Sequence, residues 1–221
     1  MHVLARARQI QRNLSADGLR ATLYKSYYYG LGYVFDAFHE RIDTTSPATQ
    51  ETLTENGTPR GDRTAAFPCH PGVLRRALDA LAVSANDVFL DIGCGKGRAL
   101  VVARRYPFQR IIGVDLIPSH IRVCRRNLER LGSRNHQLIL GDALKIDYPS
   151  DVTVCFLFKP FPEPVILACL ARLLPRPRAV ILMGSDALKH LPGYRLQETY
   201  RHGPSDRFDY LLFTREPGVE S

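Results

Sequence analysis

The chain has 221 residues, 45% of them hydrophobic and 24% charged, which is typical of a folded protein and excludes the disordered and fibrous classes. Its formal net charge of +8 means that nucleic acid has to be considered as a partner. The five cysteines are scattered without a C-x-x-C pair, and no apolar run reaches about 18 residues. We therefore expect a cytoplasmic, soluble protein without a disulfide framework or a membrane span.

The first sixty or so residues differ from the rest of the chain. Residues 1–42 combine arginine-bearing helical stretches with an aromatic run, and residues 43–64 are polar and rich in turn formers. We predict an N-terminal helical cap and polar loop over residues 1–62, followed by a single domain over residues 63–221. The aromatic side chains expected to pack this cap are Tyr24, Tyr27, Tyr28, Tyr29, Tyr33, Phe35 and Phe38. The charged residues before Asp17 are all arginines, a pattern shared by a solvated helix, which we favour, and a mitochondrial presequence.

From Pro71 onward, helix-like and strand-like segments alternate. Apolar residues at helical spacing predict helices over residues 72–82, 98–105, 118–131 and 163–174. Short apolar runs predict strands over residues 87–92, 110–114, 137–140, 152–158 and 178–183. This alternation is typical of a parallel sheet with helices on both faces. The tail differs, because strand-like residues 194–200 and 208–214 are joined without a helix and predict an antiparallel hairpin.

The positive charge is concentrated in one part of the chain. Eight arginines lie between positions 104 and 134, against only two acidic residues. On the predicted helix over residues 118–131, the apolar residues share one side, and the other side carries Arg122, Arg125, Arg126 and Arg130. We favour a solvated helix face over a phosphate-binding surface, because no aromatic residues interleave with these arginines.

The most informative segment is Phe-Leu-Asp-Ile-Gly-Cys-Gly-Lys-Gly-Arg, over residues 89–98. It places Gly93, Gly95 and Gly97 in the turn between the first strand and the next helix. Such a turn lets the backbone approach a ligand closely, and amides at the start of the helix can bind an anionic group. A dinucleotide fingerprint needs its third glycine at position 98, where Arg98 stands, so an NAD site is disfavoured.

This segment resembles the first motif of the class I S-adenosylmethionine-dependent methyltransferases. The resemblance extends over roughly residues 71–216. The sequence also resembles a poorly characterised bacterial subgroup of these enzymes that carries an N-terminal extension. The resemblance implies an α/β fold with a Rossmann-like, seven-stranded, mostly parallel sheet and an antiparallel C-terminal hairpin, and S-adenosyl-L-methionine as the cofactor. The implied cofactor-binding residues are Asp91, Gly93, Cys94, Gly95, Gly97, Asp115, Asp142, Ala143 and Phe158.

Three acidic residues in that set carry separate roles in the resembling family. Asp91 would lie near the amino-acid part of the cofactor, Asp115 would accept hydrogen bonds from the ribose hydroxyls, and Asp142 would meet the adenine amino group. Each of the three lies at or near the carboxyl end of a predicted strand, where open α/β sheets bind ligands.

The acceptor side is defined less clearly. Phe158-Lys159-Pro160-Phe161 stands where many amino-methylating relatives carry Asn/Asp-Pro-Pro-aromatic. A charged lysine has no hydrogen-bond acceptor, so it cannot take over the role of that Asn or Asp. The same difference removes the metal-liganding carboxylate of catechol-type O-methyltransferases, so we expect no metal. The acceptor-side candidates are Lys159, Phe161 and Phe67, the last as a lid, and no catalytic residue is identified.

These features predict a methyltransferase acting on an unidentified acceptor, with a small molecule favoured and the N-terminal cap covering the acceptor pocket. Two alternatives stay open. One is an RNA or protein methyltransferase that docks through the arginine-bearing helix face, and the other is a non-catalytic cofactor-binding module. Cys69 and His70 have no second pair of ligands nearby in the sequence, so we interpret them as loop residues and not as a metal site.

Overall fold

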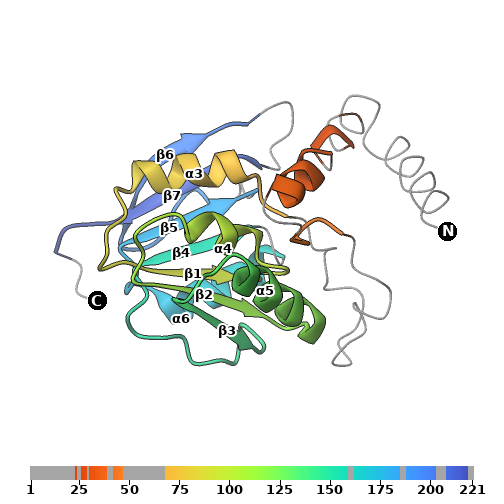
Figure 1. Ribbon diagram of the computed structural model, residues 1–221. Coiled ribbons are helices and arrows are strands. Elements are labelled where there is room, and N and C mark those ends of the chain that lie inside the picture. The colour runs from red at the N-terminus through yellow and green to blue at the C-terminus, as the bar shows by residue number, and fades with distance from the viewer. Residues whose placement is uncertain are drawn as a thin grey trace.

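The computed structural model describes residues 23, 26–28, 30–38, 42–46, 68–158, 162–184, 188–202 and 208–218 (Figure 1). The helices with defined bounds are α3 (Pro71–Ala80), α4 (Arg98–Ala103), α5 (Pro118–Arg130) and α6 (Glu163–Leu173). The strands are β1 (Val88–Ile92), β2 (Arg110–Asp115), β3 (His136–Leu140), β4 (Val154–Phe158), β5 (Ala179–Met183), β6 (Tyr194–Tyr200) and β7 (Tyr210–Arg215). All the helices and strands predicted from Pro71 onward are confirmed.

The strands form one seven-stranded sheet in the order β3-β2-β1-β4-β5-β7-β6. The four neighbouring pairs from β3 to β5 are parallel, whereas β7 runs antiparallel to both β5 and β6. The predicted sheet and its C-terminal hairpin are therefore confirmed. The chain reverses its direction of travel across the sheet between β1 and β4, and the crevice at such a switch point is the usual ligand site of open α/β sheets. Within the described segments, no helix is long and apolar enough to cross a membrane.

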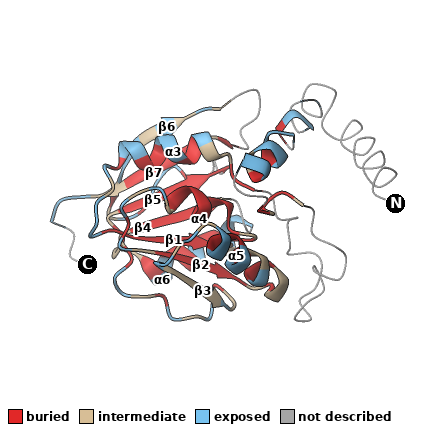
Figure 2. Cartoon of the chain, in the orientation of Figure 1, coloured by how far each residue is buried: buried red, intermediate tan, exposed pale blue. Residues whose placement is uncertain are grey.

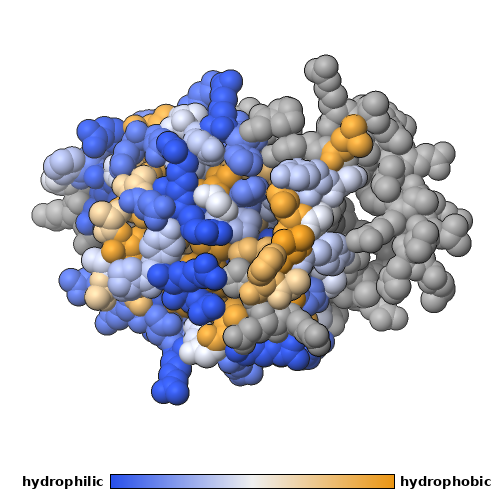
Figure 3. All heavy atoms as spheres, turned by 45° about the horizontal axis from the view of Figure 1, so that its top comes forward, coloured by the Kyte–Doolittle hydropathy of each residue, from blue (hydrophilic) through white to orange (hydrophobic). Residues whose placement is uncertain are grey.

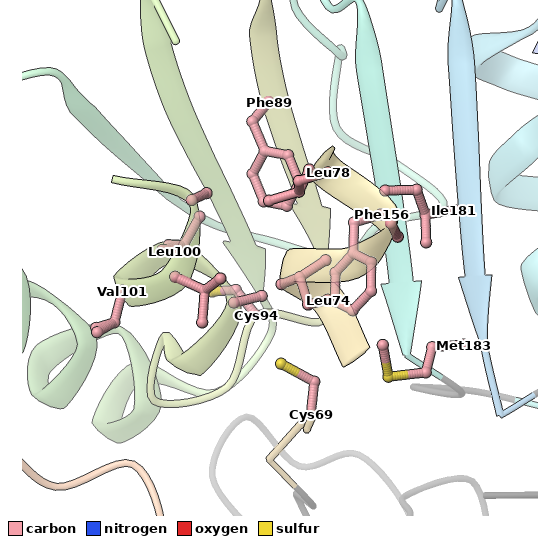
Figure 4. Packing of buried hydrophobic residues seen from close by; sticks show 14 of the residues in the cluster. Cys69, Leu74, Leu78, Phe89, Cys94, Leu100, Val101, Phe156, Ile181 and Met183 are labelled. Carbon is pink, nitrogen blue, oxygen red and sulfur yellow. The ribbon is translucent and has the colours of Figure 1, made fainter. Parts of the chain in front are cut away.

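Two apolar layers hold helices on the sheet. One layer joins Phe89 of β1 and Phe156 of β4 to Leu74 of α3 and Leu100 of α4 (Figure 4). The layer on the opposite face of the sheet packs against α6, and it includes Leu90, Leu157 and Leu170. Figure 2 shows the central strands almost entirely buried. This two-sided burial explains why the central strands read as continuous apolar runs and not as alternating patterns.

The helical residues 26–28 and 30–38 lie beside the carboxyl ends of the central strands, as the orange segment of Figure 1 shows. Tyr28 is buried there, its ring 4.1 Å from that of Phe208, and its hydroxyl donates to the carbonyl of Pro68 at 2.9 Å. The expected packing of aromatic residues is wrong for three rings, which are exposed: Tyr27, Tyr33 and Phe38. Tyr24, Tyr29 and the predicted boundary at residue 62 lie outside the described residues.

Helix α5 has the two sides expected from its sequence. Its apolar side is buried through Ile121, Cys124 and Leu128. The four arginines Arg122, Arg125, Arg126 and Arg130 are exposed. Asn127 differs from the expectation, because it is buried and 2% exposed despite its polar side chain. Asn127 makes hydrogen bonds to Lys96 and to Asp43. Asp43 belongs to the described residues 26–28, 30–38 and 42–46, here called the N-terminal segment, and the sequence pattern of α5 alone does not reveal this partner.

A buried carboxylate joins three strands at the opposite edge of the sheet, where β1, β4 and β5 begin. Asp87 is 4% exposed and accepts from Arg178 Nε at 2.6 Å, from Thr153 Oγ1 at 2.8 Å and from Ser84 N at 2.8 Å. Burial alone would raise the pKa of Asp87, but the hydrogen bonds from Arg178, Ser84 and Thr153 outweigh it and lower the pKa. The network therefore stabilises the fold only while Asp87 is ionised.

Replacing Asp87 by Asn should lower the free energy of unfolding by about 1–2 kcal/mol at neutral pH, because charge-assisted hydrogen bonds are lost. Because the pKa of Asp87 is lower in the folded state, its contribution is complete above the ordinary aspartate pKa of about 3.9 and is lost as the pH falls toward the folded value. Urea denaturation at about pH 7 and pH 3 measures both effects. The control is Asp151→Asn in the exposed Arg110–Asp151 pair, which should cost less than about 1 kcal/mol. Equal losses in the two variants would contradict the prediction.

Candidate cofactor site

A turn of three glycines connects β1 to α4. Gly93, Gly95 and Gly97 have φ angles of 80°, 53° and 87°, in the left-handed region that favours glycine. The amide of Gly93 donates to the carbonyl of Val114 at 2.9 Å, which ties the turn to the end of β2. A Cβ atom at Gly97 would lie 2.5 Å from Cys124 Sγ, so a side chain there would push the turn away from α5. The G-x-G-x-G spacing therefore reflects both the shape of the turn and its close packing.

Asp115 links the end of β2 to this turn. It is 9% exposed; its Oδ2 accepts from the amide of Gly95 at 2.8 Å and its Oδ1 from the amide of Ile117 at 2.9 Å. An ionised carboxylate has about four lone-pair positions, so both oxygens retain capacity for further hydrogen bonds. Asp115 can thus fix the turn and still accept hydrogen bonds from a ligand's hydroxyl groups.

Asp91 lies on β1 beside the same edge. It pairs in register with Gly113 of β2 and Phe156 of β4, and it is 3% exposed. Burial raises the pKa of Asp91, and the negative charge of Asp115 raises it further. Two carboxylates held close together in a buried site repel each other unless a cation lies nearby. The pair therefore suits a ligand that brings an ammonium group.

The remaining predicted cofactor residues flank these two carboxylates. Asp142 follows β3; its Oδ1 accepts from the amide of Leu144 at 3.0 Å, and its Oδ2 lies 3.7 Å from Lys145 Nζ. Ala143 is buried beside it, and half-buried Phe158 ends β4. Because β3, β2, β1 and β4 are consecutive neighbours, their carboxyl ends bring all the predicted cofactor residues to one edge of the sheet. The acceptor-side candidates Lys159, Phe161 and Phe67 lie outside the described residues.

His120 lies beside Asp115, a position that the sequence analysis missed. It lies in the first turn of α5, is 3% exposed, and its Nδ1 is 3.4 Å from Asp115 Oδ1. Within the described part of the chain, neither of its ring nitrogens makes a hydrogen bond. An unsatisfied buried polar group costs free energy, so this ring is suited to a ligand or water. No motif marks a single histidine, so only the fold reveals its position.

Two basic residues of the glycine-rich segment, Lys96 and Arg98, contact the N-terminal segment. The sequence analysis did not predict these contacts. Lys96 Nζ lies 2.8 Å from Asp43 Oδ2, and Arg98 Nη2 lies 3.3 Å from Asp36 Oδ1. Burial alone would raise the pKa of Asp43, but hydrogen bonds from Lys96 and Ser46 outweigh it and lower the pKa. The signal available in the sequence was two acidic residues in the N-terminal segment and two basic residues in the turn.

Cys69 and His70 lie in the loop before α3, as expected, and each has a structural role. Cys69 is 3% exposed, and burial raises the pKa of its thiol to about 12 (Figure 4). His70 is the N-cap of α3, because its Nδ1 accepts from the amides of Gly72 and Val73 at 3.1 and 3.2 Å. Burial, with the nearby His202, lowers the pKa of His70 to about 4, so the ring is neutral at physiological pH.

A groove of about 540 Å³ lies between α3 and β6, away from the predicted cofactor residues. Its lining includes Arg75, Arg76, Asp79 and Glu198, and none of the predicted site residues takes part. Figure 3 shows the surface around α3 as mainly hydrophilic. The buried carboxylates Asp91 and Asp115 and the buried ring of His120 lie at the carboxyl edge of the sheet instead. Within the described segments, no cluster of three or more Cys, His, Asp or Glu side chains is arranged to hold a metal ion.

The residues at the carboxyl edge fit S-adenosylmethionine. The Asp91–Asp115 pair suits an ammonium group, and Asp115 has acceptor capacity for hydroxyl groups. The buried ring nitrogens of His120 make no hydrogen bond to a described residue, and Nδ1 lies 3.4 Å from Asp115 Oδ1. The site therefore offers unused groups of the kinds that this cofactor's amino-acid and ribose parts require.

Comparisons with known proteins identify the family of this chain. The model of a family described as a methyltransferase domain matches residues 83–200, more than half of the chain. The chain is 30% identical over 93 residues to a protein-lysine N-methyltransferase of Saccharolobus islandicus, a match that covers 41% of this chain and 57% of that protein. It is 33% identical over 83 residues to a probable ribosomal RNA small subunit methyltransferase A of Methanosarcina barkeri, covering 38% and 28%.

A solved structure shares the fold. It is an RNA methyltransferase from Salinibacter ruber in complex with S-adenosyl-L-homocysteine, with a TM-score of 0.58, 21% sequence identity, and coverage of 70% of this chain and 97% of that chain. The two curated relatives match over no more than 57% of their own lengths, so the similarity concerns the domain and not their acceptors. The chain belongs to the methyltransferase-domain family.

Proposed function

We propose that S-adenosylmethionine binds at the carboxyl ends of β3, β2, β1 and β4, and that its methyl group passes to a small molecule bound beyond β4. The observation that carries the proposal is the order of Asp142, Asp115 and Asp91 along adjacent strand ends, with the glycine turn between the last two. In this assignment, Asp91 binds the ammonium group, Asp115 the ribose hydroxyls and Asp142 the adenine amino group. Cys94 and Ala143, both buried and small, leave room for the ligand beside them.

The bound cofactor supplies a methyl group already activated by its positively charged sulfur. The chain's own contribution is then to align the acceptor and to exclude water, and no specific base is required for that chemistry. Asp91 and Asp115 orient the cofactor by charge and hydrogen bonding. Phe158, at the end of β4, contributes an apolar wall on the side where the acceptor would approach.

Phe158 belongs to a cluster of packed rings beyond β4, next to which we place the small acceptor. The rings of Phe158 and Phe208 are stacked at 5.8 Å, and Tyr28 of the N-terminal segment lies 4.1 Å from Phe208. His70 and His202 continue the cluster, with ring centroids 4.5 Å apart. Rings from separate parts of the chain thus meet beyond β4, and the N-terminal segment contributes one of them. We propose Lys159, Phe161 and Phe67 as further acceptor-side residues next to this cluster.

An RNA or protein acceptor is the second candidate, supported by the names of the relatives and by the exposed arginines of α5. Transfer of labelled methyl from S-adenosylmethionine to fractionated cell extract separates the candidates. Label in the small-molecule fraction supports our proposal, whereas label in an RNase-sensitive or protein fraction supports the second candidate. Binding of the cofactor without labelling of any fraction would indicate a non-catalytic binding module.

Replacing Asp115 by Ala should weaken binding of S-adenosylhomocysteine at least tenfold, because two charge-assisted hydrogen bonds of about 1.5–3 kcal/mol each are removed. Isothermal titration calorimetry measures the affinity, and circular dichroism shows whether the variant is folded. Asp151→Ala is the control, since this carboxylate is exposed and paired with Arg110 at the opposite edge of the sheet. Affinity within twofold of the wild type in a folded Asp115→Ala variant would refute the assignment of Asp115.

Cofactor affinity should fall as the pH decreases through the raised pKa of Asp91. The carboxyl group attracts an ammonium group only when ionised, so binding at a pH near or below its raised pKa requires loss of a proton. Calorimetry in buffers with different ionisation enthalpies detects this proton release. In the Asp91→Asn variant, the proton release should disappear along with most of the affinity. Proton release that persists unchanged in this variant would assign it to another group.

Reversal of Arg122, Arg125, Arg126 and Arg130 to Glu should leave the affinity for S-adenosylhomocysteine within about threefold. These side chains are exposed on the side of α5 opposite its apolar residues, and salt weakens the long-range effect of exposed charges. The same variant tests the second candidate by gel retardation. Micromolar RNA binding by the wild type, with a steep salt dependence that the reversal abolishes, would favour RNA as the acceptor.

A further inference from the structure

Arg98 attaches the N-terminal segment to the start of α4. Its side chain is 3% exposed, and its Nη2 donates to the carbonyl of Gly32 at 3.4 Å, to Asp36 Oδ1 at 3.3 Å and to Thr45 Oγ1 at 2.5 Å. Its Nε donates to the hydroxyl of Thr44. The guanidinium carbon also lies 4.5 Å from the centre of the Phe35 ring. One guanidinium thus holds both the helical residues 30–38 and the loop residues 42–46.

The groups that accept hydrogen bonds from Arg98 are themselves held in place. Asp36 is 5% exposed; its Oδ2 accepts from the amide of Thr44 at 2.9 Å and its Oδ1 from the Thr44 hydroxyl at 2.5 Å. A Cβ atom at Gly32 would lie 2.9 Å from Thr45 Oγ1, so the helix approaches the loop as closely as only glycine allows. The position of the Arg98 guanidinium is therefore set by the N-terminal segment.

A second attachment holds the glycine turn from the same side. Lys96 Nζ donates to Asp43 Oδ2 at 2.8 Å and to the carbonyl of Ser46 at 3.0 Å. Asn127 Nδ2 donates to the carbonyls of Asp43 and Lys96, at 2.8 and 3.0 Å, and its Oδ1 accepts from the amide of Asp43 at 3.1 Å. The backbone of the turn, α5 and the N-terminal segment are thus joined by one amide side chain.

These contacts leave one part of the Arg98 guanidinium unused. Its Nη1 is fully buried and makes no hydrogen bond to any described residue. A guanidinium carries five N–H donors, and a buried donor of a charged group without a partner is costly. The remaining donors therefore have capacity for an anionic group in the protein interior.

The surroundings of this guanidinium connect it to the cofactor site. Burial is the main reason for the raised pKa of Cys69, while the positive charge of Arg98 lowers that pKa and the negative charge of Asp91 raises it. Both charges thus lie close enough to the same buried thiol to act on it. Arg98 also contributes to the lowered pKa of His70, after burial, His202 and Arg75. Arg98 also directly follows Gly97, the last glycine of the turn that Asp115 binds through the Gly95 amide, so its side chain starts from the proposed cofactor site.

We propose that Arg98 Nη1 binds the carboxylate of the methionine part of S-adenosylmethionine, and that the N-terminal segment positions Arg98 for this contact. The amino-acid part of the cofactor carries one positive and one negative group, which match the charges of Asp91 and Arg98. Residues 30–38 and 42–46 are then part of the cofactor site and not only a cover for the acceptor. This inference rests on the proposed location of the cofactor.

Removing the carboxylate from the ligand tests the contact directly. The wild-type protein should bind S-adenosylhomocysteine about 10- to 100-fold more tightly than its decarboxylated analogue, which retains the amine and the nucleoside, because a charge-assisted hydrogen bond is lost. In the Arg98→Gln variant, this preference should fall to less than about threefold. Binding of 5′-methylthioadenosine, which lacks the whole amino-acid part, should change little. All three affinities are measured by calorimetry on the full chain.

Lys96→Met is the matched control, because Lys96 is also a basic residue of this turn but its ammonium is bound to Asp43 and Ser46. It should keep the preference for the carboxylate-bearing ligand. Asp36→Asn, which loosens the hold on Arg98, should reduce that preference at least threefold. If Arg98→Gln is not folded by circular dichroism, Arg98→Lys retains a charge at the position and should keep an intermediate preference.

Several outcomes would overturn the inference. Equal wild-type affinities for S-adenosylhomocysteine and its decarboxylated analogue would show that no such carboxylate contact exists. Parallel loss of affinity for all three ligands in Arg98→Gln would assign Arg98 a structural role only. In both cases the wild-type protein still binds the cofactor, so these results do not contradict the proposed location. Absence of binding of any ligand to the wild type would refute both the location and the inference.

Discussion

The turn between β1 and α4 is the constraint on which the rest of the site depends. Three glycines in the left-handed region bring the end of β1, the end of β2 and the start of α4 together. Asp115 accepts a hydrogen bond from the amide of Gly95, so the carboxylate at the end of β2 is held by the same turn that it stabilises. Any residue with a side chain at Gly97 would collide with Cys124 and separate these elements. The site is therefore built into the first crossover of the sheet.

Charge balance explains why this region is both buried and polar. Asp91 and Asp115 lie on one side of the turn as acidic groups, and Lys96 and Arg98 lie within and after it as basic groups. The basic pair does not neutralise the acidic pair, because Lys96 and Arg98 bind Asp43 and Asp36 of the N-terminal segment. The acidic pair is thus left for a cationic ligand, and the N-terminal segment determines how the basic residues are used.

The sequence predicted the sheet and the glycine turn well for a physical reason. Burial on both faces makes β1, β4 and β5 continuous apolar runs, and the positive φ angles of the turn require glycine, so both features are visible in the sequence. The roles of His120, Lys96 and Arg98 were missed, because they depend on partners distant in the chain. In the sequence, Arg98 is informative only because it disfavours a dinucleotide site. The exposure of Tyr27 and Phe38 was also not foreseen, since the order of aromatic residues does not define which side of a helix is covered.

The central claim is that the cofactor binds at the carboxyl ends of β3, β2, β1 and β4, beside the glycine turn. A crystal structure of the chain with S-adenosylhomocysteine tests it most directly. The account predicts the ligand's ammonium group next to Asp91, its ribose hydroxyls within hydrogen-bonding distance of Asp115 and its adenine toward Asp142. A ligand seated elsewhere, such as the groove between α3 and β6, with Asp91 and Asp115 free of contact, would contradict it.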